Sequence, residues 1–193
     1  MIMENIKRFI DPLKPPTLVY LDIETTGLYA NSGDKIIEIA MLKIDGKTEE
    51  KYEQLINPCC LIPPEGSKIH RIYDDMLKGA PCFKDIAQAV LNFIEDNIVV
   101  CHNASFDLSF IVKELQDNSF ACVKFPYIDT LTLARKYFNF QSNSLGGIAK
   151  AVGIDVGVSH RAMADVLTMY QVSKYLFFNI WRKGFDEIEV GIF

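Results

Sequence analysis

The chain has 193 residues, of which 49% are hydrophobic and 23% are charged. This length and balance fit one globular domain and exclude a largely disordered chain. Its apolar runs, such as residues 98–101, are far shorter than the roughly 20 residues that a membrane helix needs. Charged side chains also interrupt the N-terminal region where a signal peptide would be apolar. We therefore expect a cytoplasmic protein with no membrane partner.

Charge and cysteine content narrow the class of protein further. The chain has 20 Lys and Arg against 25 Asp and Glu, a net charge of −5. No overall positive field would therefore attract nucleic acid, and any contact with it must be local. The 5 cysteines form neither a Cys-x-x-Cys motif nor a zinc-ligand pattern, and in a cytoplasmic protein we expect reduced thiols.

The first half of the chain favours β-structure. Residues 1–14 suit a short amphipathic helix that Pro15 and Pro16 would end, because proline lacks a backbone donor. Asp45-Gly46 indicates a hairpin between the second and third strands, and the polar third strand suits an exposed or edge position. The predicted strands are 17–23, 35–44 and 48–56.

Helical spacing dominates the second half. Apolar side chains recur every three or four residues over 83–94 and again over 106–115, on either side of a short apolar strand at 98–101. A hairpin followed by helices that alternate with a strand predicts a three-layer α/β domain, in which helices flank a mixed sheet. Further helices are expected at 129–138, 144–152 and 159–178.

Two carboxylates end the first predicted strand. Asp22 and Glu24 lie two residues apart, so the strand period of two points both to the same side of the sheet. Taken alone, the pair suits a solvated strand end. The apolar neighbours Val19, Leu21 and Ile23 indicate a largely buried strand, where two unneutralised carboxylates would be costly. A divalent cation would neutralise them, and carboxylate oxygens favour Mg²⁺ or Mn²⁺ over zinc.

Asp107 follows the predicted fourth strand and lies in the first turn of a helix. A lone aspartate there is explained by its attraction to the positive end of the helix dipole. Ligands of α/β sheets, however, gather at the carboxyl ends of strands. If the first and fourth strands are parallel neighbours, a point that the sequence alone leaves open, Asp107 lies beside Asp22 and Glu24.

His160 and Asp165 open the last predicted helix. Their spacing turns the two side chains about 140° apart on an ideal helix, so both cannot point at one site from it. We therefore expect His160 on the preceding loop, Ser159 as the N-cap and Asp165 facing inward. Taken singly, the histidine suits an exposed cap region and the aspartate a solvated helix face.

Taken together, these residues suit one reaction. Four carboxylates and a histidine at strand and helix ends are what two-metal phosphodiester hydrolysis requires. A histidine whose pKa is about 6.5 can accept a proton from water at neutral pH. The predicted ligands of two divalent cations, Mg²⁺ or Mn²⁺, are Asp22, Glu24, Asp107 and Asp165, and the predicted general base is His160.

Three motifs around these residues resemble those of the DnaQ-like family of 3′-to-5′ exonucleases, in its DEDDh class. The motifs are Asp22-Ile-Glu-Thr-Thr-Gly27, His102-Asn-Ala-Ser-Phe-Asp107 and His160-Arg-Ala-Met-Ala-Asp165, in the family order. The resemblance implies a ribonuclease H-like three-layer α/β/α fold with a five-stranded mixed sheet. It also implies metal binding by the four carboxylates and a histidine base, because the tyrosine class would have Tyr where this chain has Arg161.

The same resemblance implies a site for the 3′-terminal nucleotide. Family members bind this nucleotide through the turn after the first strand and through an Ile-His-Gly-Ile segment, which residues 69–72 resemble with Arg71 in place of glycine. The second motif adds an aromatic ring that can stack on a base. The candidate residues are Thr25, Thr26, Leu28, His70, Asn103 and Phe106.

The resemblance covers residues 17–178, which leaves 1–16 as an N-terminal extension and 179–193 as a tail expected to pack on the domain. It implies a metal-dependent exonuclease that shortens single-stranded or frayed DNA from the 3′ end in proofreading or repair, with a DNA polymerase as candidate partner. An exoribonuclease of the RNase T or oligoribonuclease kind shares the same five residues. A catalytically silent nucleic-acid-binding module would be expected to lack one of them. A glycosidase fits less well because it needs only two carboxylates.

Overall fold

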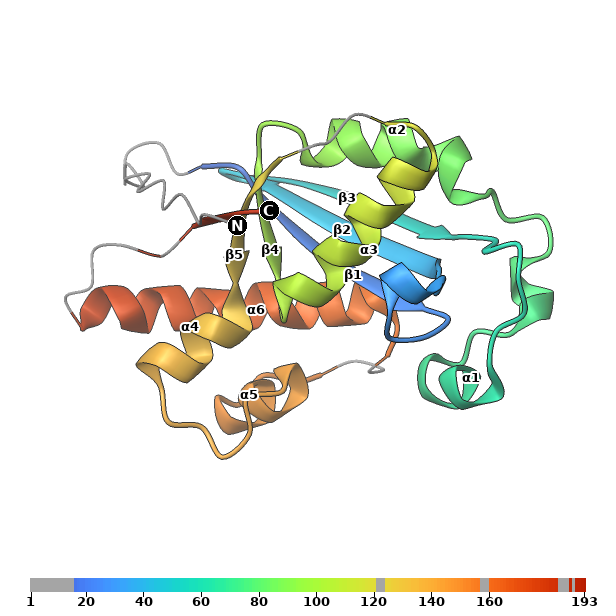
Figure 1. Ribbon diagram of the computed structural model, residues 1–193. Coiled ribbons are helices and arrows are strands. Elements are labelled where there is room, and N and C mark those ends of the chain that lie inside the picture. The colour runs from blue at the N-terminus through green and yellow to red at the C-terminus, as the bar shows by residue number, and fades with distance from the viewer. Residues whose placement is uncertain (1–15, 121–123, 157–159, 184–187, 189) are drawn as a thin grey trace.

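The computed structural model describes residues 16–120, 124–156, 160–183, 188 and 190–193. These residues form an α/β domain around one sheet with the strand order β3-β2-β1-β4-β5-β6 (Figure 1). The strands are β1 (Leu18–Thr25), β2 (Ile36–Asp45), β3 (Thr48–Leu55), β4 (Ile98–Cys101), β5 (Pro126–Asp129) and β6 (Gly191–Ile192). The helices are α1 (Pro64–His70), α2 (Phe83–Ile94), α3 (Ala104–Asp117), α4 (Thr130–Tyr137), α5 (Leu145–Ala151) and α6 (Ala162–Arg182), with 3₁₀ turns η1 (Ala30–Ser32) and η2 (Asp74–Leu77).

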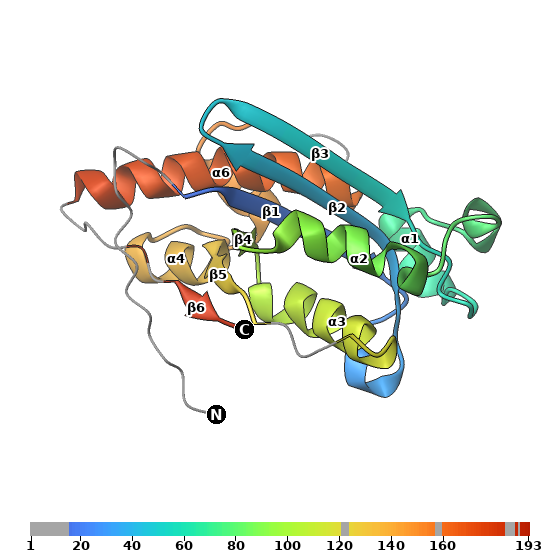
Figure 2. The same cartoon turned by 90° about the horizontal axis from the view of Figure 1, so that it is seen from above.

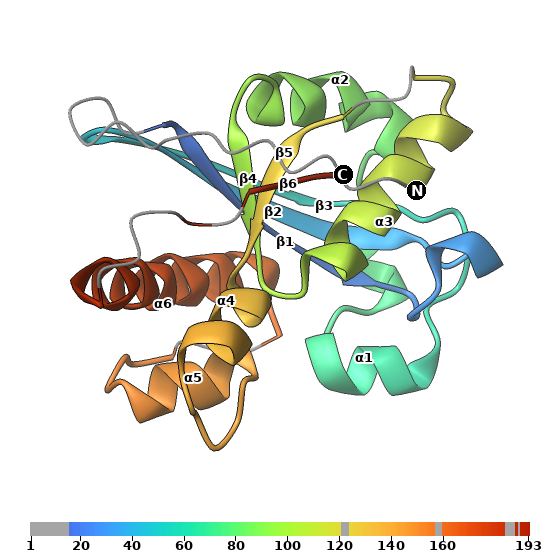
Figure 3. The same cartoon turned by 60° about the vertical axis from the view of Figure 1, so that its left-hand side comes forward.

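Helices cover both faces of the sheet. α2 and α3 pack on one face, and α4, α5 and α6 pack on the other (Figures 2 and 3). The predicted three-layer arrangement is therefore confirmed. The sheet has six strands rather than the five that the resemblance implied, because β6 from the predicted tail pairs antiparallel with β5.

The described part of the predicted tail packs on the domain. Val190 is buried, and the ring of Phe193 lies edge-on to Tyr127 with centroids 6.1 Å apart. α6 runs to Arg182, so the boundary expected at residue 179 falls inside a helix. The helix expected at residues 1–14 lies outside the described residues.

The central strand β1 alternates between the two cores. Val19, Leu21 and Ile23 pack in the cluster that α2 and α3 cover, whereas Tyr20 packs in the cluster on the α6 side. The Tyr20 hydroxyl lies 2.8 Å from Ser173 Oγ on α6, and burial raises the pKa of Tyr20 to about 12. Because side chains alternate along a strand, the residues two and four positions after Tyr20 also face α6.

The pairing of β1 brings distant segments to one edge of the sheet. β1 and β4 are parallel neighbours, with Leu18 opposite Ile98 and Tyr20 opposite Val100. This adjacency, which the sequence left open, places the carboxyl ends of both strands at the same edge. The predicted hairpin is also confirmed, because β2 and β3 pair antiparallel around Gly46, whose φ is +58°.

Some element boundaries differ from the predictions. The helix predicted at 83–94 matches α2. The sequence pattern missed α1, which has only 7 residues and begins at a proline. Pro64 occupies the first helical turn, where a missing N–H costs nothing. The pattern also missed β5, which has only 4 residues and is too short to show alternation.

The long last helix begins and ends later than predicted. We expected residues 159–178, whereas α6 spans Ala162–Arg182. Its far end leaves Phe178 and Trp181 exposed, at 56% and 65% of their surface. None of the helices in the described ranges is long and apolar enough to cross a membrane.

Candidate active site

Three carboxylates meet where the carboxyl end of β1 reaches the first turn of α6. Oxygen atoms of Asp22, Glu24 and Asp165 all lie within 4.8 Å of one another, and the three side chains are half-buried. Asp22 and Glu24 are on the strand face that carries Tyr20, as their spacing predicted. They therefore point toward α6 and not toward α2 and α3.

The packing of α6 on β1 brings Asp165 to this pair. The hydrogen bond between Tyr20 and Ser173 fixes one point of contact. Asp165 lies two turns before Ser173, about 12 Å along the helix axis. Asp22 and Glu24 lie about 7 and 13 Å beyond Tyr20 along β1. Because α6 runs in the opposite direction to β1, going back along α6 from Ser173 follows β1 forward from Tyr20 (Figure 1). The similar distances along the two elements therefore bring Asp165 beside Asp22 and Glu24.

Asp107 approaches from α3, whose first turn follows β4. Its side chain is buried, with 3% of its surface exposed. Backbone groups of Asp107 itself and of Ile23 hydrogen-bond to the carboxylate, and the charge of Asp107 raises the pKa of Asp22. Asp107 is outside the 4.8 Å group, yet it lies next to it because β1 and β4 are parallel neighbours.

Burial, together with repulsion from neighbouring carboxylates, raises the pKa values of all four carboxyl groups. Burial and then the charges of Asp107 and Asp165 hold the pKa of Asp22 well above its usual range. Burial and then Asp165 and Glu38 raise the pKa of Glu24 to about 8. Burial likewise raises the pKa of Asp165 and of Asp107. An all-oxygen donor set with unneutralised charge fits a hard divalent cation.

His160 lies on the loop before α6, as predicted, with its side chain exposed and its φ at +64°. Its backbone N–H donates to Asp165 Oδ2 at 2.9 Å, and its charge lowers the pKa of that carboxyl group. The predicted helix start at Ser159 is wrong, because α6 begins at Ala162 with Arg161 in the N-cap position. Ser159 itself lies outside the described residues.

The turn after β1 is held by its own threonines. Thr25 Oγ1 donates to the carbonyl of Gly27 at 2.6 Å, and Thr26 Oγ1 accepts from the Lys35 N–H at 2.9 Å. A Cβ atom at Gly27 would lie 2.4 Å from the Asp34 carboxylate, so a larger residue there would have to displace this side chain, which accepts the N–H of Tyr29. Leu28 is 69% exposed next to this turn. Both threonine hydroxyls are thus engaged inside the turn, whereas the Leu28 side chain is free for contact.

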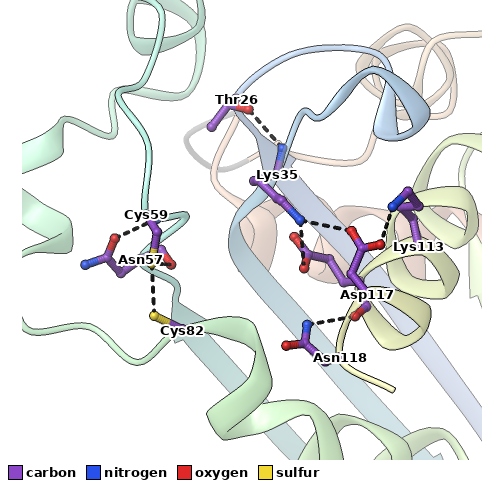
Figure 4. A network of polar contacts seen from close by, with 9 residues as sticks. Thr26, Lys35, Asn57, Cys59, Cys82, Lys113, Asp117 and Asn118 are labelled. Carbon is purple, nitrogen blue, oxygen red and sulfur yellow. Dashed lines mark hydrogen bonds and ion pairs between the residues drawn. The ribbon is translucent and has the colours of Figure 1, made fainter. Parts of the chain in front are cut away.

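An ion-pair network ties this turn to α3. Lys35 Nζ lies 3.4 Å from Glu114 Oε2 and 3.2 Å from Asp117 Oδ2, and Lys113 also pairs with Asp117 (Figure 4). Glu114 is buried and Asp117 is exposed at the end of the helix. The network therefore connects the strand ends of β1 and β2 with the helix that carries Asp107.

His70 ends α1 near the same site and is buried, with 3% of its surface exposed. Its Nδ1 accepts the N–H of Ile72 at 3.1 Å, so the ring proton lies on Nε2, which has no hydrogen-bond partner among the described residues. Burial lowers the pKa of His70, and the charges of Glu38 and His160 also affect it. Arg71, where the resemblance expects glycine, has a left-handed φ of +59°.

Asn103 and Phe106, the two other candidates from the second motif, differ in how exposed their side chains are. Asn103 is exposed, has a φ of +78°, and donates its backbone N–H to Asp129 Oδ1 at 3.0 Å. The Phe106 ring is half-buried, packs on the core and lies 5.1 Å from the Phe110 ring. His102 is held between Thr130 Oγ1 and the Asn143 carbonyl, at 2.9 Å from each, and is structural.

Sequence reasoning missed two residues next to the site, Glu38 and Arg161. Glu38 lies on β2 directly opposite Glu24, is fully buried and pairs with Arg161. The available signal was a single acidic residue inside the apolar run 36–42. Such a residue needs a partner when it is buried.

Comparisons with known proteins agree with this geometry. The family model described as Exonuclease, RNase_T, matches residues 19–173. The DNA polymerase III subunit epsilon of Buchnera aphidicola is 38% identical over 169 residues, which cover 79% of this chain and 70% of the relative. The DNA polymerase III PolC-type of Clostridium perfringens is 34% identical over 89% of this chain. The chain spans only 11–12% of the length of such PolC-type relatives.

Solved structures share the fold. E. coli exonuclease I in complex with a dT13 oligonucleotide superposes with a TM-score of 0.74 at 19% identity, over 86% of this chain and 42% of that chain. Exonuclease X in complex with 5′ overhanging duplex DNA gives a TM-score of 0.64 at 24% identity, over 84% and 92%. These neighbours bear out the ribonuclease H-like fold that the motifs implied.

Proposed function

The chain belongs to the exonuclease family, and on this basis we propose that it hydrolyses phosphodiester bonds at DNA 3′ ends and releases nucleoside monophosphates. One observation carries the proposal. Asp22, Glu24 and Asp165 place their oxygens within 4.8 Å of one another, beside buried Asp107 and the loop that presents His160. This is the set of groups that two-metal phosphodiester hydrolysis needs.

In this proposal the four carboxylates hold two divalent cations, Mg²⁺ or Mn²⁺. The ligands are Asp22, Glu24, Asp107 and Asp165. Their raised pKa values fit the assignment, because burial, aided by repulsion from neighbouring carboxylates, makes the charged forms costly in the absence of a cation. When bound, the cations supply electrostatic stabilisation of the charge that develops on the phosphate oxygens.

His160 takes the proton from the attacking water. Its exposed side chain lies on a loop, so it can reach a water above the carboxylates. The 2.9 Å hydrogen bond from its backbone N–H to Asp165 keeps it next to them. A neutral imidazole accepts a proton efficiently near pH 7.

The 3′-terminal nucleotide binds between the turn after β1 and the end of α1. Leu28 offers an exposed apolar surface, and His70 offers a buried Nε2–H donor that has no partner among the described residues. The hydroxyls of Thr25 and Thr26 are engaged within the turn, so these residues contribute backbone groups. From the α3 side, the nucleotide contacts Asn103 and the accessible part of the Phe106 ring.

The proposed substrate is single-stranded or frayed DNA, and the proposed role is proofreading or repair in the cytoplasm beside a DNA polymerase. The relatives named as DNA polymerase III subunit epsilon and PolC-type support this role. The structural neighbours in complex with DNA support the substrate. A protein with a net charge of −5 binds bare DNA weakly, so a polymerase that delivers the 3′ end fits the charge.

The test is degradation of 5′-labelled single-stranded DNA and of the matching RNA, with Mg²⁺, Mn²⁺ or EDTA. We expect a metal-dependent ladder that shortens from the 3′ end on DNA and is absent in Asp22→Ala. Asp155→Ala, which changes an exposed aspartate, is the matched control and should degrade DNA normally.

Two outcomes would contradict the proposal. A ladder on RNA alone would assign the protein to RNA turnover. The absence of a ladder on either polymer, from a folded protein that also fails to bind Mn²⁺ by calorimetry, would leave a nucleic-acid-binding module.

A further inference from the structure

An ion pair between the buried Glu38 and the partly exposed Arg161 lies at the start of α6, directly beside the carboxylate site. Arg161 Nε lies 3.0 and 3.2 Å from the two carboxylate oxygens of Glu38, and Arg161 Nη2 lies 2.7 Å from Glu38 Oε1. The backbone N–H of Ala162 donates to Glu38 Oε2 at 3.0 Å. Glu38 thus accepts from a guanidinium and from a helix N-terminus at once, and we refer to this arrangement as the Glu38–Arg161 latch.

The position of Glu38 shows that its partners are needed. The side chain is 0% exposed at the third residue of β2, and removing the partner of a buried carboxylate leaves an uncompensated charge. Glu38 lies opposite Glu24 in the β1–β2 register and so occupies the same face of the sheet. Its two oxygens are both engaged, which distinguishes it from the carboxylates that are free to bind cations.

Arg161, one member of the Glu38–Arg161 latch, directly follows the proposed base His160 in the chain. Arg161 lies between His160 and the first residue of α6, so its contact with β2 fixes where the loop ends. The first N–H groups of a helix lack partners within it. Here Glu38 satisfies that of Ala162, while Asp165 accepts the N–H of His160. The start of α6 is therefore held from two sides.

We propose that the Glu38–Arg161 latch positions His160 and Asp165 over the ends of β1, and that Arg161 and Glu38 are positioning residues of the nuclease site. The proposal rests on the proposed function for its kinetic readout. An arginine is required because its planar guanidinium binds both carboxylate oxygens, which a lysine ammonium does not do.

The first test compares Arg161→Ala with Arg182→Ala, which removes an exposed arginine at the far end of the same helix. We expect Arg161→Ala to lower kcat by roughly 10- to 100-fold, as displacement of a reacting group by about 1 Å does. KM should stay within about threefold. Millimolar guanidinium should restore part of kcat, whereas equal NaCl and Arg161→Lys should not. Arg182→Ala should behave as the wild type.

The partner residue gives a second variant that keeps the shape of the site. Glu38→Gln should lower kcat as Arg161→Ala does, and the double variant should be no worse than either single one, because both remove the same interaction. A wild-type kcat in folded Arg161→Ala overturns the proposal. A loss of kcat that follows the loss of thermal stability and that guanidinium does not rescue also overturns it.

Histidine NMR separates this proposal from the proposed function. The chain has 3 histidines, and His160 is the exposed one, whereas His70 is buried and His102 is held by two hydrogen bonds. Arg161→Ala should shift the ring signal of His160 and leave that of His102 unchanged. If the wild type fails to degrade DNA, the proposed function fails, and this signal still decides the latch. An unmoved His160 signal overturns it.

Discussion

Two groups of acidic side chains in this molecule differ in their neighbours. At the end of α3, Lys35 lies within 3.4 Å of Glu114 and 3.2 Å of Asp117, and Lys113 is the main cause of a lowered pKa at Asp117. At the end of β1, carboxylates face one another, and the pKa of Glu24 rises to about 8. Lysine partners neutralise the carboxylates at the end of α3 within the fold, whereas we propose that a cation supplies the opposite charge at the end of β1.

The largest difference between the two groups should appear on removal of one carboxylate. Asp165→Asn should lower exonuclease activity on the order of 10³-fold or more, because a metal ligand is lost. The protein should remain folded, and its metal-free melting temperature should not fall, because repulsion is relieved. Asp117→Asn, the same change in the lysine-paired group, should keep activity within about threefold. Steady-state kinetics and thermal melting of both variants measure this contrast, and equal effects on activity would contradict it.

Loss of the proposed base should have the next largest effect. His160→Ala should lower kcat by roughly 10² to 10⁴-fold while Mn²⁺ binding persists, since the carboxylates remain. Parallel kinetics and calorimetric titration with Mn²⁺ test this, and an unchanged kcat in the folded variant would assign the base elsewhere.

The stability of the metal-free protein should depend on pH, in a direction set by the raised pKa of Glu24 at the end of β1. Glu24 has a folded pKa of about 8 against an ordinary value of 4.5, so between these values the folded state keeps a proton that the unfolded state releases. The free energy of unfolding should therefore fall as pH rises from about 5 to 8, on the order of 3 kcal/mol. Urea unfolding in EDTA measures this slope. Glu24→Gln should reduce this slope and saturating Mn²⁺ should flatten it, because the other raised carboxyl groups remain in the variant, and a rising slope would contradict the assignment.

The smallest effect should come from removing the cation of the paired group. Lys35→Met leaves buried Glu114 without its lysine, which should lower the free energy of unfolding by about 1–3 kcal/mol. Activity should change little, because the turn after β1 keeps its backbone hydrogen bonds to residue 35. Adding Glu114→Gln should restore part of the stability, and urea unfolding of both variants tests the pairing.

The sequence predicted the parts of the site that follow from local spacing. The period of two placed Asp22 and Glu24 on one face, and the 140° argument placed His160 on a loop, both as observed. The adjacency of β1 and β4 is a long-range fact that no local pattern contains. The start of α6 was misplaced for the same reason, because its cap comes from Glu38, which lies 124 residues before Ala162.

The exposure of Trp181 has a consequence for spectroscopy. It is the only tryptophan in the chain, 65% of its surface is exposed, and it lies at the end of α6 remote from Asp165. Its fluorescence therefore starts from a water-like environment and changes little when the core unfolds or when ligands occupy the carboxylate site. Near-ultraviolet circular dichroism of the buried Tyr20, which packs on Tyr170 at 5.3 Å between ring centroids, is the better intrinsic probe of folding.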